Sequence, residues 1–173
     1  MLYKELNKIE LCMHDFAKSI KKLQNEFGIN APNSVIRQFY LDHHDKSAFI
    51  ELYGELDLHN IKWRLKNISI EDLLFINEEA TYPDFVKEIA QNAKFYYELG
   101  DAVIDTRIDI IQYWKNHGTW KTPPILINGT ILKNPTSKFH LVEGHTRLGN
   151  LKGIYTEKVF KLANFHKIYY GEY

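Results

Sequence analysis

Cysteine is nearly missing from this chain of 173 residues, in which Cys12 is the single thiol. One thiol cannot form an intramolecular disulfide, so a reducing compartment is expected. Long apolar runs are missing as well, because none approaches the roughly 18 residues that cross a bilayer. The residues that follow Met1 also lack the apolar core of a signal peptide. These absences predict a cytoplasmic protein that has no membrane partner.

The chain also lacks an excess of charge of either sign, with 22 basic residues against 22 acidic ones. A balanced protein has no long-range attraction to nucleic acid, and no basic stripe is visible, so a nucleic-acid partner is not expected. The charges are nevertheless uneven along the chain. From Asp101 onward ten basic and six acidic residues give a balance of +4, which leaves twelve against sixteen, a balance of −4, before it. The carboxy-terminal part is thus the more favourable place for an anionic ligand.

Residues 1–58 are predicted to form an all-helical segment. Apolar side chains recur every three or four residues over residues 2–27, which is the period of one amphipathic helix. These apolar positions are Leu2, Leu6, Ile9, Met13, Phe16, Ile20, Leu23 and Phe27. Gly28 and Pro32 supply stop signals, and further helices are expected from about residue 33 and over residues 47–56. Because the apolar face needs a partner and no Gly/Ser/Pro-rich linker follows, we expect this segment to pack on the rest of the chain.

Residues 59–173 show the pattern of an α/β (α+β) domain with a small mixed sheet and packed helices. Ile61, Trp63 and Leu65 alternate with charged residues, as in a half-buried strand. Further strands are expected at residues 124–127, 139–143 and 159–170. Helices are expected at residues 68–74, 83–99, 104–116 and 146–153, and the last of these is expected to end at Gly153.

One turn in this domain carries recognisable chemistry: Glu143, Gly144, His145, Thr146 and Arg147 lie between a predicted strand and a predicted helix. That order places backbone N–H groups at a helix amino terminus, where those groups and the helix dipole attract anions. Gly144 lets the backbone approach a ligand closely. Arg147 adds a planar, permanently charged donor set that suits phosphate. The turn is therefore the candidate phosphate site.

The runs at residues 123–127 and 139–153 resemble the signature of ParB/sulfiredoxin-like domains. In that family a short "PI-V" strand leads to an "LVDGHHR" or "LVxGERR" turn and then to a short helix rich in small residues. The resemblance covers about 110 residues, of which the last thirty or so are specific. It implies the family's fold, and by likeness to members that bind CTP or ATP it places Gly144, His145, Thr146 and Arg147 at the phosphates. Free-serine kinases of the superfamily carry an acidic residue where this chain has Glu143.

The chain departs from each of these relatives. No cysteine lies near the turn, so the sulfiredoxin reaction is not expected, and the second arginine of the "GERR" form is missing. No helix-turn-helix is expected after the motif, which argues against chromosome partitioning. Asp42, His43, His44 and Asp45 look like a metal cluster, but adjacent histidines on a helix point about 100° apart. We therefore predict no structural metal.

The first functional hypothesis is a nucleotide- or phosphate-binding ParB-like protein, acting as an NTP-dependent phosphotransferase, a nucleotidase or a switch. ATP or CTP with Mg²⁺ would be its ligand. Glu143 would be a general base or a Mg²⁺ ligand, and His145 a phosphate donor or an acid, while Thr146 and Arg147 bind phosphate. An alternative is a non-catalytic module that binds a protein partner, as immunity or antitoxin proteins do. A second alternative is a nucleic-acid-binding protein. Whether the chain is an enzyme is left open.

Overall fold

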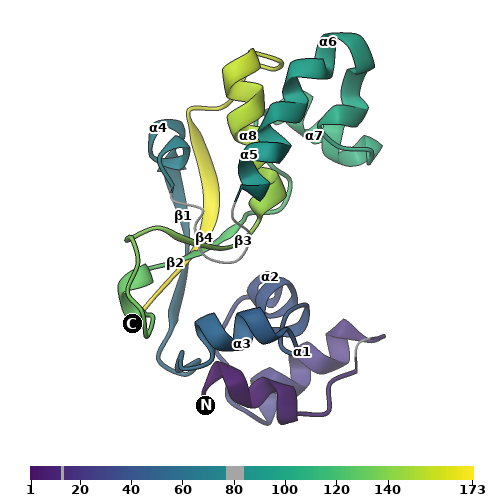
Figure 1. Cartoon of the computed structure of the whole chain (residues 1–173). Coiled ribbons are helices and arrows are strands. Elements are labelled where there is room, and N and C mark those ends of the chain that lie inside the picture. The colour runs from purple at the N-terminus through teal and green to yellow at the C-terminus, as the bar shows by residue number, and fades with distance from the viewer. Residues whose placement is uncertain (13, 77–83) are drawn as a thin grey trace. The chain divides into compact units, whose positions relative to one another are not determined.

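The computed structural model describes residues 1–12, 14–76 and 84–173. It is a mixed α/β structure with a helical amino-terminal region and a four-stranded sheet in the order β1-β4-β2-β3 (Figure 1). The strands are β1 (Lys62–Ser69), β2 (Ile125–Ile127), β3 (His140–Glu143) and β4 (Phe165–Glu172). The chain divides into two compact units. Unit 1 comprises residues 1–65, 125–143 and 169–173, and unit 2 comprises residues 66–124 and 144–168.

The amino-terminal region is not the single helix that the apolar period predicts. It contains the 3₁₀-helix η1 (Tyr3–Lys8), α1 (Phe16–Asn25), α2 (Asn33–Val35), the π-helix η2 (Ile36–Leu41) and α3 (Ser47–Tyr53). The side chain of Ser19 bonds both the N–H and the carbonyl of Cys12, at 2.8 and 3.0 Å, and Asp15 caps α1 by accepting from the N–H of Lys18. These side chains compete with the backbone bonds of a continuous helix and explain the break.

The predicted stop at Gly28 is confirmed. Gly28 adopts a φ of +66°, and beyond it the N–H of Ile29 donates to the carbonyl of Leu23 at 3.1 Å. This bond, which closes the end of α1 across a left-handed glycine, is the helix-terminating arrangement that glycine permits at no steric cost.

The core of unit 1 joins the amino-terminal helices to the sheet. Tyr3 stacks on Phe39 at 4.8 Å, and both side chains are fully buried. The same apolar cluster includes Ile125 and Ile127 of β2 and Val142 of β3. Each fully buried side chain of this size contributes about 1.5–3 kcal/mol to folding. The helical residues and the two strands therefore share one core, and unit 1 continues past the predicted boundary near residue 58.

Strand β2 is central in unit 1 and is buried along its whole length. It pairs antiparallel with β3, where Ile125 faces Glu143, and parallel with β4, where Ile127 faces Gly171. A continuous apolar strand suits a position with neighbours on both sides. This register fixes Glu143 at the end of the sheet where the chain leaves β3.

Unit 2 is mainly helical. Its helices are α4 (Ile70–Leu74), α5 (Phe85–Asn92), η3 (Ala93–Phe95), α6 (Tyr96–Leu99), η4 (Gly100–Val103), α7 (Ile108–His117) and α8 (His145–Glu157). The predicted start of the helix at residues 83–84 falls partly outside the described residues, and α7 begins four residues later than predicted. Within the part of the chain that the structure describes, no helix is long and apolar enough to cross a membrane.

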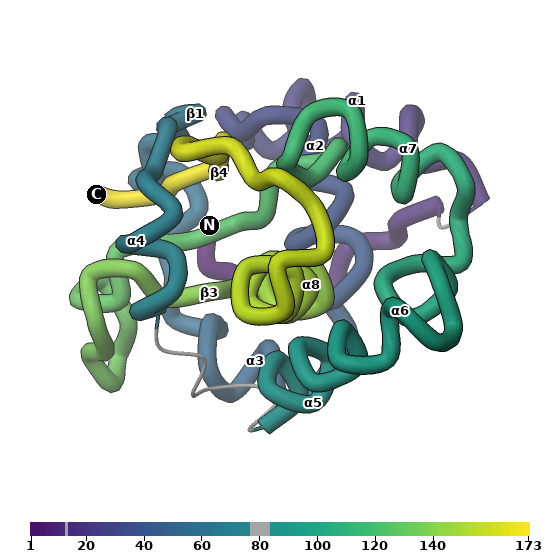
Figure 2. Tube along the Cα trace, turned by 90° about the horizontal axis from the view of Figure 1, so that it is seen from above, coloured from purple at the N-terminus to yellow at the C-terminus, as the bar shows by residue number. Residues whose placement is uncertain are grey.

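Helices α5 and α8 lie side by side in unit 2 (Figures 1 and 2). The prediction that α8 ends at Gly153 is wrong, because the helix continues to Glu157. A Cβ atom at Gly153 would lie 2.5 Å from the carbonyl oxygen of Ala90 and 2.9 Å from the Cβ of Ala93. Glycine at this position therefore allows α5 and α8 to pack closely. The same packing explains why the helix of the motif is rich in small residues.

Candidate functional site

The candidate site is the amino terminus of α8, which follows the strand–glycine–helix order that the sequence predicts. Gly144 is the N-cap residue, with φ 108° and ψ 23°, and as a glycine it has no side chain of its own to cap the helix. The first helical bond runs from the N–H of Leu148 to the carbonyl of Gly144 at 2.9 Å. The first backbone N–H groups of an α-helix have no partner within the helix. A 13-residue helix therefore presents its positive dipole end here.

Gly144 is required by packing as well as by its backbone angles. A Cβ atom on it would lie 2.4 Å from the Cβ of Pro124 and 3.1 Å from Nε of Arg147. Pro124 thus occupies the space beside Gly144 into which a side chain would project. The glycine alone is accordingly no argument for a ligand.

Arg147, in the first turn of α8, is half-buried, and one terminal nitrogen of its guanidinium donates to the carbonyl of Thr122 at 3.2 Å. The segment that carries Thr122 is itself anchored within unit 2. The indole N–H of Trp120 donates to the carbonyl of Lys167 at 2.7 Å, and Gly118 accepts from the N–H of Ala163 at 3.0 Å. The guanidinium is therefore held in place before any ligand arrives, which lowers the entropy cost of binding.

The two residues between Gly144 and Arg147 differ in exposure. His145 is buried, with 6% of its surface accessible, whereas Thr146 is exposed. Thr146 is thus the better placed of the two to offer a side-chain hydroxyl to a ligand in solution. The predicted role of His145 as an acid or a phosphate donor stays a prediction.

Glu143 belongs to unit 1, at the end of β3, one residue before the left-handed Gly144. Its Oε2 lies 3.2 Å from Nε2 of His43. The imidazole of His43 stacks on the ring of Phe49, at 4.0 Å between centroids and 4° between planes. This pair could not be predicted from the sequence, because 100 residues separate its members and no local spacing signals it.

The two histidines of the polar run at residues 42–45 contact different groups. His43 contacts Glu143, whereas Nδ1 of His44 lies 2.8 Å from the carbonyl of Leu41. In the residues that the structure describes, no group of three or more His, Cys, Asp or Glu side chains could hold a metal ion. Any metal at Glu143 would therefore need ligands from the substrate it binds.

Two other histidines are buried and contact hydroxyl groups within the protein. His140 lies 2.9 Å from both the hydroxyl of Tyr53 and the hydroxyl of Thr136. His166 is 1% exposed, and its Nδ1 lies 2.8 Å from the hydroxyl of Thr119. Burial lowers the pKa of His166 to about 4, so this side chain is neutral near pH 7.

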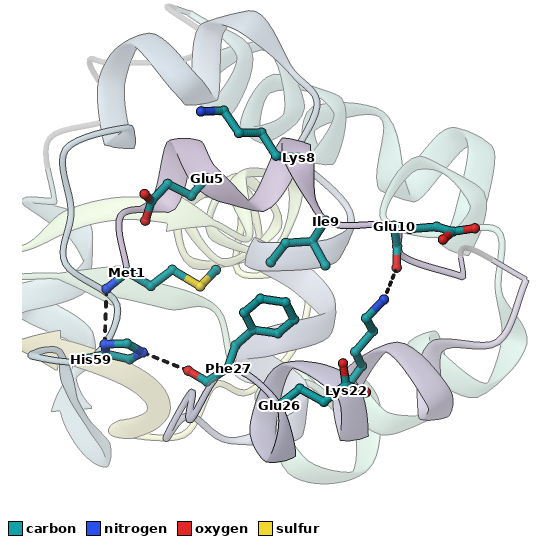
Figure 3. Close-up of a pocket in the computed structure, with 9 residues that line it drawn as sticks. All are labelled: Met1, Glu5, Lys8, Ile9, Glu10, Lys22, Glu26, Phe27 and His59. Carbon is teal, nitrogen blue, oxygen red and sulfur yellow. Dashed lines mark hydrogen bonds between the residues drawn. The ribbon is translucent and has the colours of Figure 1, made fainter.

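A hollow of about 690 Å³ opens elsewhere in unit 1, and none of the five turn residues lines it (Figure 3). Met1, Ile9 and Phe27 supply its apolar surface. His59 links its two sides, with ring nitrogens 3.1 Å from the amino group of Met1 and 2.8 Å from the carbonyl of Phe27. The charged lining residues are Glu5, Lys8, Glu10, Lys22 and Glu26. Carboxylates and amino groups are mixed there, so the hollow selects no charge class.

No family model, curated protein or solved structure matches this chain. The resemblance to ParB/sulfiredoxin-like domains accordingly rests on the motif residues themselves, and it stays a prediction.

Proposed function

We propose that the protein binds a nucleotide, or another phosphate-bearing small molecule, at the amino terminus of α8. The observation that carries the proposal is the position of Arg147, which is held by the carbonyl of Thr122 in the first turn of this 13-residue helix, next to the N–H groups of the helix start. An anion there receives hydrogen bonds from backbone N–H groups and gains from the helix dipole, which together suit phosphate. The ParB/sulfiredoxin-like resemblance points to the same turn.

Arg147 and Thr146 are the side chains that bind the phosphate in this proposal. Arg147 is already oriented through Thr122, and a guanidinium can bridge two phosphate oxygens. Thr146 is exposed in the first helical turn, where its hydroxyl can donate to a phosphate oxygen. His145 is buried, and its proposed role remains that of a phosphate donor or an acid.

Glu143 is proposed to act through Mg²⁺. A carboxylate next to a bound phosphate repels it unless a cation or a proton intervenes. Mg²⁺ is commonly bound by one or two carboxylates together with substrate phosphates, and one carboxylate is what the turn supplies. The ion would neutralise charge on the phosphate oxygens. The ligand in this proposal is accordingly ATP or CTP with Mg²⁺, and a general-base role for Glu143 is the competing assignment.

A second candidate function is binding of a protein partner, and the exposed apolar side chains of unit 2 favour it. Several of them are more than half exposed: Phe75 at 87%, Tyr97 at 76%, Ile108 at 74%, Leu99 at 66% and Phe165 at 63%. Single exposed apolar residues are ordinary, so these side chains would mark an interaction surface only where they form a contiguous group. An immunity- or antitoxin-type module would use such a surface and would need no nucleotide.

Calorimetric titration of the folded protein with ATP, CTP and GTP, each with and without Mg²⁺, separates the two functions. Binding of at least one nucleotide with a dissociation constant below about 1 mM supports the first. Absence of binding to all three by a protein that melts cooperatively excludes it and leaves the partner-binding function.

A further inference from the structure

The connection between α7 and β2 is bonded at three successive residues to the segment that leads into β4, and both belong to unit 2. The three bonds join Gly118 to Ala163 at 3.0 Å, Thr119 to His166 at 2.8 Å and Trp120 to Lys167 at 2.7 Å. Hydrogen bonds from consecutive residues restrain a backbone more than a single contact does, because each removes part of its remaining freedom. The first half of this connection is therefore fixed.

Trp120 is the most firmly held residue of the connection. Its side chain is 3% exposed, and its indole N–H donates to the carbonyl of Lys167. The indole meets the ring of Trp114 edge to face, with 6.2 Å between centroids and 86° between planes, which is a favourable aromatic geometry. A buried N–H that lost its acceptor would be costly. The position of Trp120 is accordingly determined by packing and by a hydrogen bond together.

Thr122 follows two residues later and carries the carbonyl that accepts from Arg147. Its own side chain is exposed, so the position of its carbonyl depends on the residues on either side. Trp120 is buried on one side, and Pro124 is buried on the other, against Gly144. The acceptor that orients the guanidinium is therefore placed by buried neighbours.

We infer that Trp120 is a positioning residue for Arg147, because it holds the Thr122 carbonyl in the place where this carbonyl orients the guanidinium for a phosphate. The inference rests on the proposed function, since it assigns a role in binding at the same turn. Immobilising a long side chain costs entropy when a ligand binds, and a side chain that is already oriented avoids part of this cost. Trp120 is buried and makes no contact with the ligand itself.

Calorimetric titration of Trp120→Phe, with the nucleotide that binds the wild type best, tests the role. Phenylalanine keeps an aromatic ring and removes the N–H donor, so binding should weaken about two- to tenfold, which is less than the loss for Arg147→Ala. In an Arg147→Ala background, Trp120→Phe should add nothing. Trp63→Phe is the matched control, because it removes an indole bond of 3.1 Å to the Tyr40 hydroxyl in unit 1. It should bind like the wild type. Unchanged binding by Trp120→Phe, or an equal loss in both backgrounds, would overturn the inference.

The order of the Arg147 side chain tests the same role without nucleotide. Nitrogen-15 relaxation of its Nε–H group should show an ordered side chain in the wild type and in Trp63→Phe, and a more mobile one in Trp120→Phe. Equal order in the wild type and Trp120→Phe would contradict the inference. If Trp120→Phe does not fold, Thr119→Val takes its place, since it removes the bond to His166 from the same connection. It too should make Arg147 more mobile, and unchanged order would count against the role.

The failures of the two proposals are distinguishable. If the wild type binds no nucleotide while Trp120→Phe makes Arg147 more mobile, the proposed function is lost, and with it the role of Trp120 in binding. If the wild type binds a nucleotide while Trp120→Phe changes neither the order of Arg147 nor the affinity, the inference alone fails.

Discussion

Some residues of the turn between β3 and α8 could be chosen from the sequence, whereas the residues that contact them could not. Gly144 and Arg147 could be selected from the sequence, because a glycine and an arginine around a strand–helix turn are typical of phosphate sites. Their neighbours in space could not. Pro124, Thr122 and His43 approach the turn through tertiary structure, and no sequence spacing encodes those approaches.

At the scale of the residue, Gly144→Ala should destabilise the protein by about 2 kcal/mol or more. A left-handed conformation costs an L-residue about 1–2 kcal/mol, and the added methyl group also meets Pro124. Urea unfolding measures the change. The matched control is Gly28→Ala, which has a similar positive φ but no atom within 4 Å of its Cβ position. If the two variants lose equal stability, the contact with Pro124 contributes nothing.

Whole elements were predicted with uneven success, and the errors have physical causes. The strands at β1, β2 and β3 and the helix starts after Gly144 and near Ser47 follow from periodicity and turn chemistry. The apolar period over residues 2–27 indicates which side chains are buried. It carries no information on the hydrogen bonds of Ser19 and Asp15, which interrupt the helix. From the sequence, Gly153 predicts a helix end, yet the residue lies inside α8. It is explained by the close packing of α5, which leaves no room for a side chain at this position.

The packing of α5 on α8 gives a prediction at the scale of the element. In an isolated helix Gly→Ala is stabilising by about 1 kcal/mol, but Gly153→Ala would place a methyl group 2.5 Å from the Ala90 carbonyl. Overpacking of this kind costs about 1–3 kcal/mol, so thermal and urea stability should fall. Thr156→Ala, at an exposed position of the same helix, should be neutral or stabilising. A stabilised Gly153→Ala protein would contradict the close packing.

For the whole molecule, the division into two units cuts across the chain order. Unit 1 combines the amino-terminal helices with β2, β3 and the last residues, so its core contains Tyr3 together with Ile125 and Val142. The sequence predicted that the helical segment needs a partner, because its apolar face is continuous. It could not show which strands supply that partner, since this is a matter of tertiary contacts. Whether residues 59–173 also form a domain of their own stays a prediction.

Limited proteolysis tests this shared core at the scale of the whole molecule. Cleavage near residue 60 should not release a stable carboxy-terminal fragment, because loss of the helices would expose the buried faces of β2 and β3. Mass spectrometry of the digest over time measures this, with the urea-unfolded chain as the control for cleavable sites. A persistent fragment that starts near Asn60, with the helices digested at once, would contradict the prediction.

Calorimetric titration of Arg147 variants, with the nucleotide that binds the wild type best, tests the proposed phosphate site directly. Arg147→Ala should weaken binding about ten- to a hundredfold, since a charge-assisted contact to phosphate contributes about 1.5–3 kcal/mol. Arg147→Lys should recover part of this loss, because lysine cannot make the two-pronged contact. Arg107→Ala, an arginine of the same unit paired with Asp105, should bind like the wild type. If Arg147→Ala also binds like the wild type while remaining folded, the phosphate site is not at the amino terminus of α8.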